Sequence, residues 1–166
     1  MSATDLVRRV LAAFESADVE PLLSVLDDNV VWKSAFQHDT GLRIRGEYHG
    51  RAGALEIISE IAMIAHFSRF HPKEILSDGV VVWCLVEAEA APTHNLADKR
   101  TFDAALRCRV RNGRILEIQN FFDTASLRAH LVPAAAKAAT RETSPDCDLA
   151  QTPELVQPPK LAQAAA

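Results

Sequence analysis

Excess positive charge, long apolar runs and patterned cysteines are all missing from this sequence of 166 residues. Lys and Arg number 18 against 22 Asp and Glu, for a net charge of −4, so the chain gives no sign of the basic face that nucleic-acid binding requires. The longest apolar run, residues 80–86, has only the length of a strand, and no segment is predicted to span a membrane. Because 48% of the residues are nonetheless hydrophobic, the chain can form the core of one domain.

The three cysteines, Cys84, Cys108 and Cys147, do not have the spacing of a metal site or a redox motif. Cys84 and Cys108 lie among apolar residues of predicted strands, which predicts buried free thiols. The N-terminal residues form a charged, amphipathic pattern and lack the apolar region of a signal peptide. Together these features predict a cytoplasmic protein in a reducing environment.

The most informative stretch is LRCRVRNGRILEIQNFFDTASL, residues 106–127. Apolar and arginine residues alternate over 106–111, as in a strand with one buried face. Asn112-Gly113 predicts a two-residue hairpin turn, because both central positions of a type I′ turn need a positive φ. A partner strand is predicted over 115–122.

Helical spacing of apolar residues predicts three helices in the first half of the chain. The first is predicted to be capped by Thr4, the second to span 19–26 and end at the acidic segment 27–29, and the third to span 51–65. A strand is predicted to start at Val30, between the second and third helices.

Four strands are predicted in the second half, over 67–76 with a bulge near Pro72, then 80–90, 100–110 and 115–122. Consecutive strands joined by short connections form an antiparallel meander. Helices gathered before an antiparallel sheet predict an α+β domain.

The chain changes character after the last strand. Asp123 or Thr124 is predicted to cap a short helix that begins near Ala125. Residues 132–166 contain five of the eight prolines and no aromatic residue, which predicts a flexible, disordered Ala/Pro-rich tail. The folded domain is therefore expected over residues 1–131.

Two segments and the element order carry a family resemblance. YHGRAGALEII (48–58) and GRILEIQNFFDTASL (113–127) resemble the SnoaL-like, ketosteroid isomerase-like branch of the nuclear transport factor 2-like superfamily. The resemblance covers roughly residues 4–131 and implies a cone-shaped, curved, antiparallel or mixed sheet, wrapped on the N-terminal helices around a central apolar pocket. It also implies a small apolar ligand and a homodimer formed through the outer face of the sheet. The run 80–86, apolar on both strand faces, supports a covered outer face.

The catalytic residues that the resemblance implies are only partly present. Steroid isomerases of the superfamily use an acidic base and an acidic oxyanion donor, where this chain has Lys33 and Leu106. Its epoxide hydrolases use an Asp on the last strand, where this chain has Asn120. The remaining acid–base candidates are Asp123 and His49, for a cofactor-independent isomerase, cyclase or dehydratase acting on an apolar carbonyl-bearing substrate.

Each catalytic candidate has a simpler alternative. Asp123 stands where an acidic residue caps a helix, and His49 stands in a loop before the third helix. If neither is catalytic, the domain is a non-catalytic module that binds a ligand or dimerises. No histidine pair has the spacing of metal ligands on a helix, so no metal is expected. The isomerase, cyclase or dehydratase chemistry needs no cofactor, so none is expected.

The pocket predicted from the resemblance is lined by apolar and polar residues of the first strand, the segment before the third helix and the meander: Trp32, Tyr48, Phe67, Arg107, Asn120 and Phe122. Glu87 is a buried acid if its strand face is concave, and a surface or interface residue if that face is convex. Arg107 has a structural alternative to a pocket role, since it can pair with Glu87, Glu89 or Glu117 across the strands.

Overall fold

The computed structural model describes residues 1–16, 18–36, 42 and 44–132, and the predicted tail lies outside this range except for Val132. The helices are α1 (Ala3–Ser16), α2 (Val19–Val25), α3 (Gly50–Ile64) and α4 (Thr124–Leu131). The strands are β1 (Leu26–Lys33), β2 (Glu47–His49), β3 (Ala65–Ser77), β4 (Val81–Pro92), β5 (Arg100–Arg111) and β6 (Arg114–Phe122).

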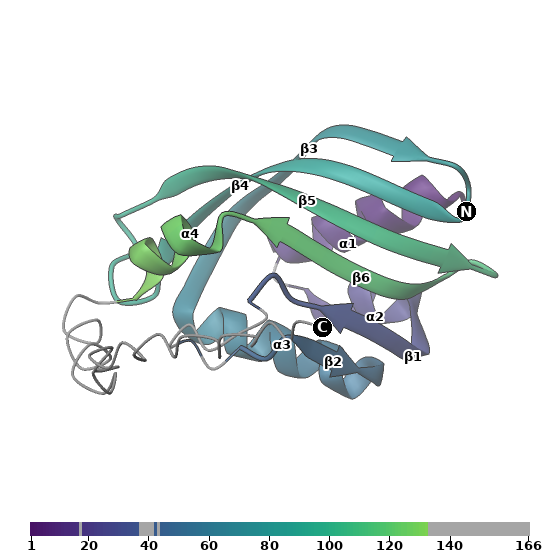
Figure 1. Ribbon diagram of the computed structural model, residues 1–166, viewed down its shortest axis with the longest axis horizontal. Helices are drawn as coiled ribbons and strands as arrows, with labels where there is room; N and C mark the ends of the chain where they lie inside the picture. Colours follow the sequence, from purple (N-terminus) through teal and green to yellow (C-terminus); the bar gives the residue numbers. More distant parts are fainter. Residues whose placement is uncertain (17, 37–41, 43, 133–166) are drawn as a thin grey trace, which may run out of the picture.

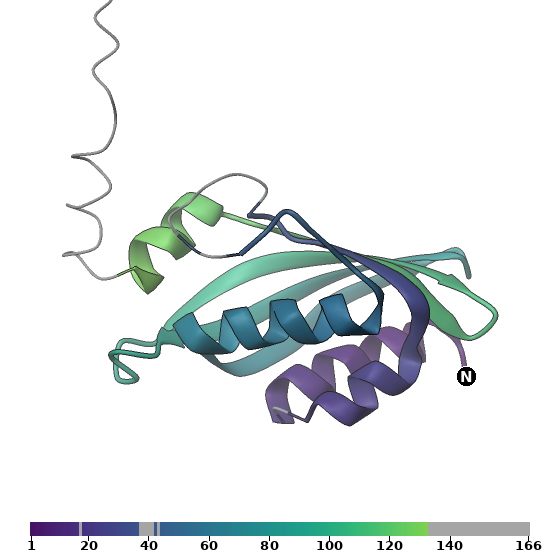
Figure 2. The same cartoon turned by 90° about the horizontal axis from the view of Figure 1, so that it is seen from below.

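The strands form one sheet in the order β2-β1-β6-β5-β4-β3. All neighbours run antiparallel except β1 and β6, which are parallel, so the sheet is mixed. The sheet curves without closing, and α1, α2 and α3 lie along its concave side, as Figures 1 and 2 show. The predicted α+β class, the curved mixed sheet and the final meander are confirmed.

The turn and bulge predictions are also confirmed. Asn112 and Gly113 both have positive φ, 53° and 71°, as the tight turn between β5 and β6 demands. The pairing of β3 with β4 shifts register between Pro72 and Glu74. Proline lacks the N–H that a strand ladder uses, which accounts for an irregularity at this position on the edge strand.

The cap predicted for the first helix is wrong by two residues. Ser2 caps α1: its Oγ accepts the backbone N–H of Asp5 at 3.2 Å, and its own N–H donates to the Asp5 carboxylate at 2.9 Å. This reciprocal pair satisfies two backbone donors at once. Thr4 instead shares a hydrogen bond with the Ser2 hydroxyl at 2.8 Å.

Strand β1 begins at Leu26, four residues before the predicted start at Val30. Residues 27–29, which were expected to end the second helix and precede the strand, lie within the strand. Leu26 is fully buried and pairs with Ile115 on β6, which is fully buried as well. Burial of this apolar pair outweighs the poor strand propensity of the aspartates that follow.

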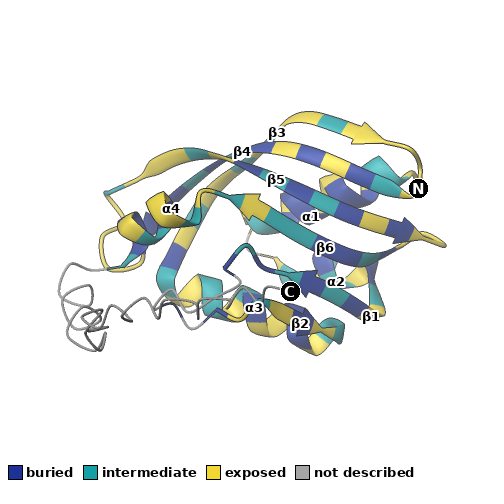
Figure 3. Ribbon diagram, in the orientation of Figure 1, coloured by how far each residue is buried: buried dark blue, intermediate teal, exposed yellow. Residues whose placement is uncertain are grey.

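The meander has one buried face and one solvated face, visible as alternating colours along β4 and β5 in Figure 3. Val82, Cys84 and Val86 point to the concave side and are fully buried. Cys84 and Cys108 are buried free thiols, as predicted, and burial raises their pKa values to about 11 and about 12. Within the described residues, no helix is long and apolar enough to cross a membrane.

Candidate functional site

A cavity of about 50 Å³ lies between the concave face of the sheet and the helices. Its walls come from α1, α3, α4, the three strands β3, β5 and β6, and the segment after β1. Six of the seven phenylalanines line it, together with aliphatic residues and two polar ones: Phe14, Ser34, Phe36, Ile44, Ile61, Ile64, Ala65, Phe67, Phe70, Phe102, Ala104, Leu106, Asn120, Phe122, Leu127 and Leu131. The interior is therefore strongly aromatic although only 6% of the chain is aromatic.

The six phenylalanine rings touch one another in a continuous series. The ring centroids are 4.9–6.4 Å apart, in the order Phe14, Phe70, Phe67, Phe102, Phe122 and Phe36. Most of these contacts are edge-to-face or tilted, the arrangements that aromatic quadrupoles favour. The pocket wall is thus a set of coupled rings, in which displacement of one ring affects its neighbours.

A bulge in β3 brings two of these rings to the same side. Phe67 and Phe70 are three residues apart, which in a regular strand would place them on opposite faces. The register of β3 against β4 shifts between Phe67 and Arg69, and both rings consequently line the pocket, stacked at 4.9 Å. An irregularity in strand pairing therefore builds part of the site.

Two polar side chains, Asn120 and Ser34, interrupt the apolar wall. The indole Nε1–H of Trp32 donates to Oδ1 of Asn120 at 3.2 Å. Since an indole nitrogen can only donate, this bond fixes which side of the amide carries the oxygen. The Asn120 amino group, Nδ2, bonds to no described residue and is left as a donor for a ligand. The Ser34 hydroxyl oxygen accepts the N–H of Phe36 at 3.1 Å.

No described side chain in the pocket wall is titratable. The arrangement offers a ligand apolar contact and a hydrogen-bond donor, but no acid or base from the described residues. The described part of the chain also holds no group of three metal-ligating residues. His38 and Asp39, which follow the pocket residue Phe36 in the sequence, lie outside the described residues.

Of the six residues predicted to line the pocket, Phe67, Asn120 and Phe122 do so. Trp32 is fully buried behind the wall, where it contacts Phe14 edge-on and orients Asn120. Arg107 lies on the convex face, where it pairs with Glu117.

Tyr48 is buried too, but it belongs to a separate polar cluster. Its hydroxyl accepts the N–H of Arg45 at 2.6 Å and donates to the Glu60 carboxylate. Burial, together with the bond to Glu60, raises the pKa of Tyr48. The Arg45 guanidinium also lies 4.8 Å from the centre of the Tyr48 ring, a cation–π distance. Tyr48 therefore joins β2 to α3 rather than lining the pocket.

The catalytic candidates Asp123 and His49 lie outside the pocket wall. Asp123 is exposed and caps α4, accepting the backbone N–H of Ser126 at 3.0 Å and its hydroxyl at 2.6 Å. These bonds hold the pKa of the Asp123 carboxyl below its ordinary value. The His49 side chain is 71% exposed and lies 3.0 Å from the Glu47 carboxylate.

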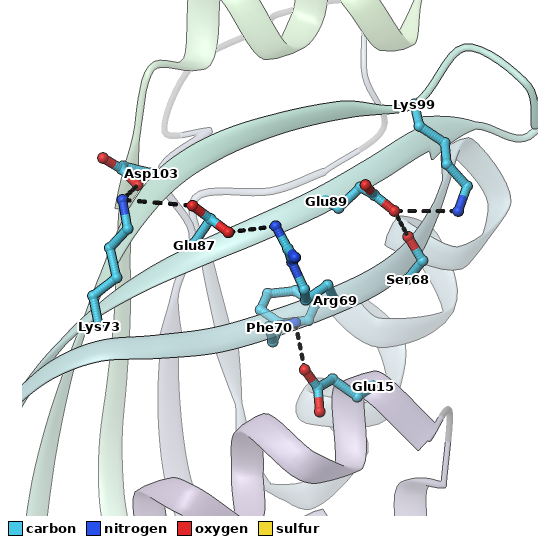
Figure 4. A network of polar contacts seen from close by, with 9 residues as sticks. All are labelled: Glu15, Ser68, Arg69, Phe70, Lys73, Glu87, Glu89, Lys99 and Asp103. Carbon is cyan, nitrogen blue, oxygen red and sulfur yellow. Dashed lines mark hydrogen bonds and ion pairs between the residues drawn. The ribbon is translucent and has the colours of Figure 1, made fainter.

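The convex face carries a series of ion pairs. Glu87 points to this face, the second of its two predicted alternatives, and pairs with Arg69 and with Lys73, which also contacts Asp103 at 2.6 Å (Figure 4). The Glu117 carboxylate is only 12% exposed. Of the acidic partners predicted for Arg107, Glu117 is the one that it contacts. Two further cations lie near the Glu117 carboxylate, Lys33 at 3.4 Å and Arg109 at 3.9 Å.

Sequence reasoning missed four pocket phenylalanines: Phe14, Phe36, Phe70 and Phe102. A signal existed for Phe14, which occupies the apolar face of the first predicted helix. Phe70 could not be found by strand periodicity, because the bulge reverses the face on which it lies. The clustering of nearly all phenylalanines is a property of the folded chain alone.

Comparison with known proteins agrees with this architecture. A protein of unknown function with a nuclear transport factor 2-like fold, from Burkholderia pseudomallei, superposes with a TM-score of 0.70 at 21% identity, covering 78% of this chain and 97% of that one. TerC, crystallised with polyporic acid, gives a TM-score of 0.70 at 20% identity, with 77% and 96% covered.

A third similar structure is a protein with a ketosteroid isomerase-like fold from Catenulispora acidiphila, in complex with trimethylamine. Its TM-score is 0.64 at 15% identity, with 81% of this chain and 98% of that one covered. No curated protein sequence matches this chain. A family model described as the SnoaL-like domain matches residues 7–118, and because that match spans more than half of the sequence, the chain belongs to the SnoaL-like family.

Proposed function

We propose that this protein binds a small, mainly apolar ligand in the phenylalanine-lined pocket, with Nδ2 of Asn120 donating a hydrogen bond to an acceptor oxygen of the ligand. The observation that carries the proposal is the composition of the wall: six phenylalanines, aliphatic side chains and one amide whose oxygen is already occupied by Trp32. An apolar pocket with few placed polar groups is the usual form of a small-molecule site. Two of the similar structures contain a small molecule, polyporic acid or trimethylamine.

Of the two functions expected from the sequence, ligand binding without catalysis has the better support. Isomerase, cyclase or dehydratase chemistry needs a side chain that moves a proton at the reacting atom. Asp123 is exposed, engaged with Ser126 and held at a low pKa, so it is a weak base. His49 is exposed and paired with Glu47. Acid–base catalysis would require a proton carrier beyond the described pocket wall.

The proposal is tested by placing a large side chain on the pocket face of β5 and, as a control, on the opposite face. Ala104 lines the pocket, and its neighbour Ala105 lies on the opposite face of the same strand. Acetophenone serves as the probe, because it combines an aromatic ring with a carbonyl acceptor. We expect Ala104→Phe to weaken acetophenone binding at least tenfold in calorimetry or ligand-observed NMR, and Ala105→Phe to leave it within twofold. Equal affinity in both variants, or no binding to the natural chain, would contradict the proposal.

The homodimer through the outer sheet face remains a proposal, and exposed apolar residues support it. Trp83, Leu85 and Phe121 are 43%, 39% and 39% exposed, and the rings of Trp83 and Phe121 stack at 5.5 Å on the convex face. We expect the chain to sediment as a dimer and Trp83→Glu to sediment as a monomer. Met63→Glu, at an exposed position of α3, is the matched control and should remain a dimer. A natural chain that sediments as a monomer would overturn the proposal.

A further inference from the structure

The pocket has too little free space for an aromatic ligand. Its 50 Å³ is about a third of the roughly 150 Å³ of an engineered cavity that admits benzene. A ligand of the proposed kind therefore requires part of the wall to move. The position of the movable part determines the route of entry and the shape of ligand that the site accepts.

A larger hollow lies on the other side of one wall. A groove of about 720 Å³ runs between α1, α2, α3 and the start of β3. Figure 2 shows these three helices on the same side of the sheet. Four residues line both the pocket and the groove: Phe14, Ile61, Ala65 and Phe67. A single layer of side chains thus separates the two spaces.

Phe67 is the part of this layer best placed to move. Its side chain is half-buried, and it lies at the bulge where β3 loses its register with β4. The strand after it is held at two residues, one through its backbone and one through its side chain, as Figure 4 shows. The Glu15 carboxylate accepts the N–H of Phe70 at 2.8 Å, and the Ser68 hydroxyl donates to Glu89 at 2.5 Å. With the strand anchored, opening of the wall at this point falls on the Phe67 ring, which turns against its neighbours Phe70 and Phe102.

We infer that rotation of Phe67 joins the pocket and the groove into one elongated ligand site. This inference rests on the proposed function. The ligand it predicts is an amphiphile with two parts. Its ring and acceptor oxygen occupy the pocket against Asn120, and an uncharged alkyl tail passes Phe67 and lies in the groove.

The groove walls specify the tail. Val19, Leu22, Ile58 and Leu96 offer apolar contact along its length. Glu15 and Asp18 lie at its rim, so a tail that ends in a carboxylate would meet charges of its own sign. The predicted tail is therefore neutral and aliphatic, and its length is limited by the groove.

A pair of probes that differ only in the tail tests the inference. Acetophenone reaches only the pocket, once the wall has moved to admit its ring, and 4-hexylacetophenone adds six carbons that reach into the groove. Each buried methylene strengthens binding about threefold to fourfold, so the natural chain should bind 4-hexylacetophenone at least thirtyfold more tightly than acetophenone, even if the tail is only partly buried.

Two adjacent residues of α3 provide the variant and its control. Ala62 lines the groove and not the pocket, whereas Met63 is 69% exposed and lines neither. Ala62→Trp should weaken 4-hexylacetophenone at least tenfold and leave acetophenone within twofold. Met63→Trp should leave both affinities unchanged. Because both positions are solvent-exposed, neither variant is expected to unfold the protein.

Association kinetics test the movement itself. Phe67→Leu should speed association of 4-hexylacetophenone at least fivefold, because the smaller side chain opens the shared wall. Phe102 lines only the pocket, so Phe102→Leu should change the association rate by no more than twofold.

The two proposals fail in different ways. Equal affinities for the two probes in the natural chain, or equal losses in the Ala62 and Met63 variants, would overturn the elongated site. The pocket proposal would survive that result if Ala104→Phe still weakened acetophenone binding at least tenfold. No binding of either probe to the natural chain would overturn both.

Discussion

The indole of Trp32 and the amide of Asn120 form one polar unit beside an otherwise apolar cavity, joined by a hydrogen bond of 3.2 Å. Trp32 is fully buried and Asn120 lines the pocket, so the bond links the core of β1 to the pocket-facing side of β6. Because the indole can only donate, it leaves the amide nitrogen free for a ligand.

A double-mutant cycle should detect this bond as a coupling. Asn120→Leu leaves the buried indole N–H unpaired and should lower the free energy of unfolding by about 1–3 kcal/mol. Trp32→Phe removes the donor and also leaves a cavity. The double variant should be less destabilised than the sum of the two by about 0.5–1.5 kcal/mol in urea titrations. Strict additivity would show that the bond contributes nothing.

Asp123 should behave as a helix cap. Asparagine keeps an acceptor for the Ser126 N–H and alanine does not, so Asp123→Asn should preserve amide protection in α4 while Asp123→Ala reduces it. Hydrogen exchange of the α4 amides measures both. The affinity of Asp123→Asn for acetophenone should stay within twofold of that of the natural chain. If Asp123→Asn instead lost an enzymatic activity while its α4 amides stayed protected, the carboxylate would be catalytic.

The low pKa of Asp123 adds a pH dependence to this test. A carboxyl whose folded pKa lies below its unfolded value stabilises the folded state above the unfolded pKa, and this stabilisation is lost as the pH falls through the folded pKa. Protection of α4 should therefore decline below about pH 3.8 in the natural chain. The decline should be absent from Asp123→Asn.

Glu117 should contribute more to stability than the exposed ion pairs of the convex face. Burial of its carboxyl opposes ionisation, but hydrogen bonds from Arg107 and Lys33 outweigh burial and hold its pKa below the ordinary value. Glu117→Gln leaves three cations without their shared partner and should cost about 1–3 kcal/mol at pH 7. The cost should shrink as the pH falls below about 4.5, where the natural carboxyl begins to protonate. Glu74→Gln, exposed on β3, is the control and should change stability little at either pH.

Cys84 and Cys108 should be inert in the folded protein. Burial raises their pKa values to about 11 and about 12, so both stay protonated between pH 7 and pH 9. Iodoacetamide followed by peptide mass mapping should leave both unmodified until denaturant is added. Modification of either residue in native buffer would indicate that β4 and β5 open locally.

The parts of the fold that the sequence predicted depend on local chemistry. Asn112-Gly113 forms the tight turn between β5 and β6, and it was recognisable because few other residue pairs accept two positive φ values. The α+β class followed from the order of helical and strand periodicities. The cap of α1 was harder to predict, since Ser2 and Thr4 are both good capping residues. Only the residue at which the helix starts decides between them.

The site was less predictable than the fold. Phe67, Asn120 and Phe122 were expected in the pocket and line it, while Trp32 and Tyr48 lie behind the wall and Arg107 lies on the other face of the sheet. A strand pattern gives two faces but not which of them is concave. That assignment depends on where the helices pack.

The sequence by itself determined the hairpin, the order of the elements and the alternating faces of the meander, because propensity and periodicity act between residues close along the chain. Only the tertiary structure decided that β1 joins β6 in parallel and that a bulge turns Phe67 and Phe70 to one side. It also decided that residues of α1, α3 and α4 close around one amide. These features arise from contacts between distant segments, whose energies depend on packing and burial that no local pattern records.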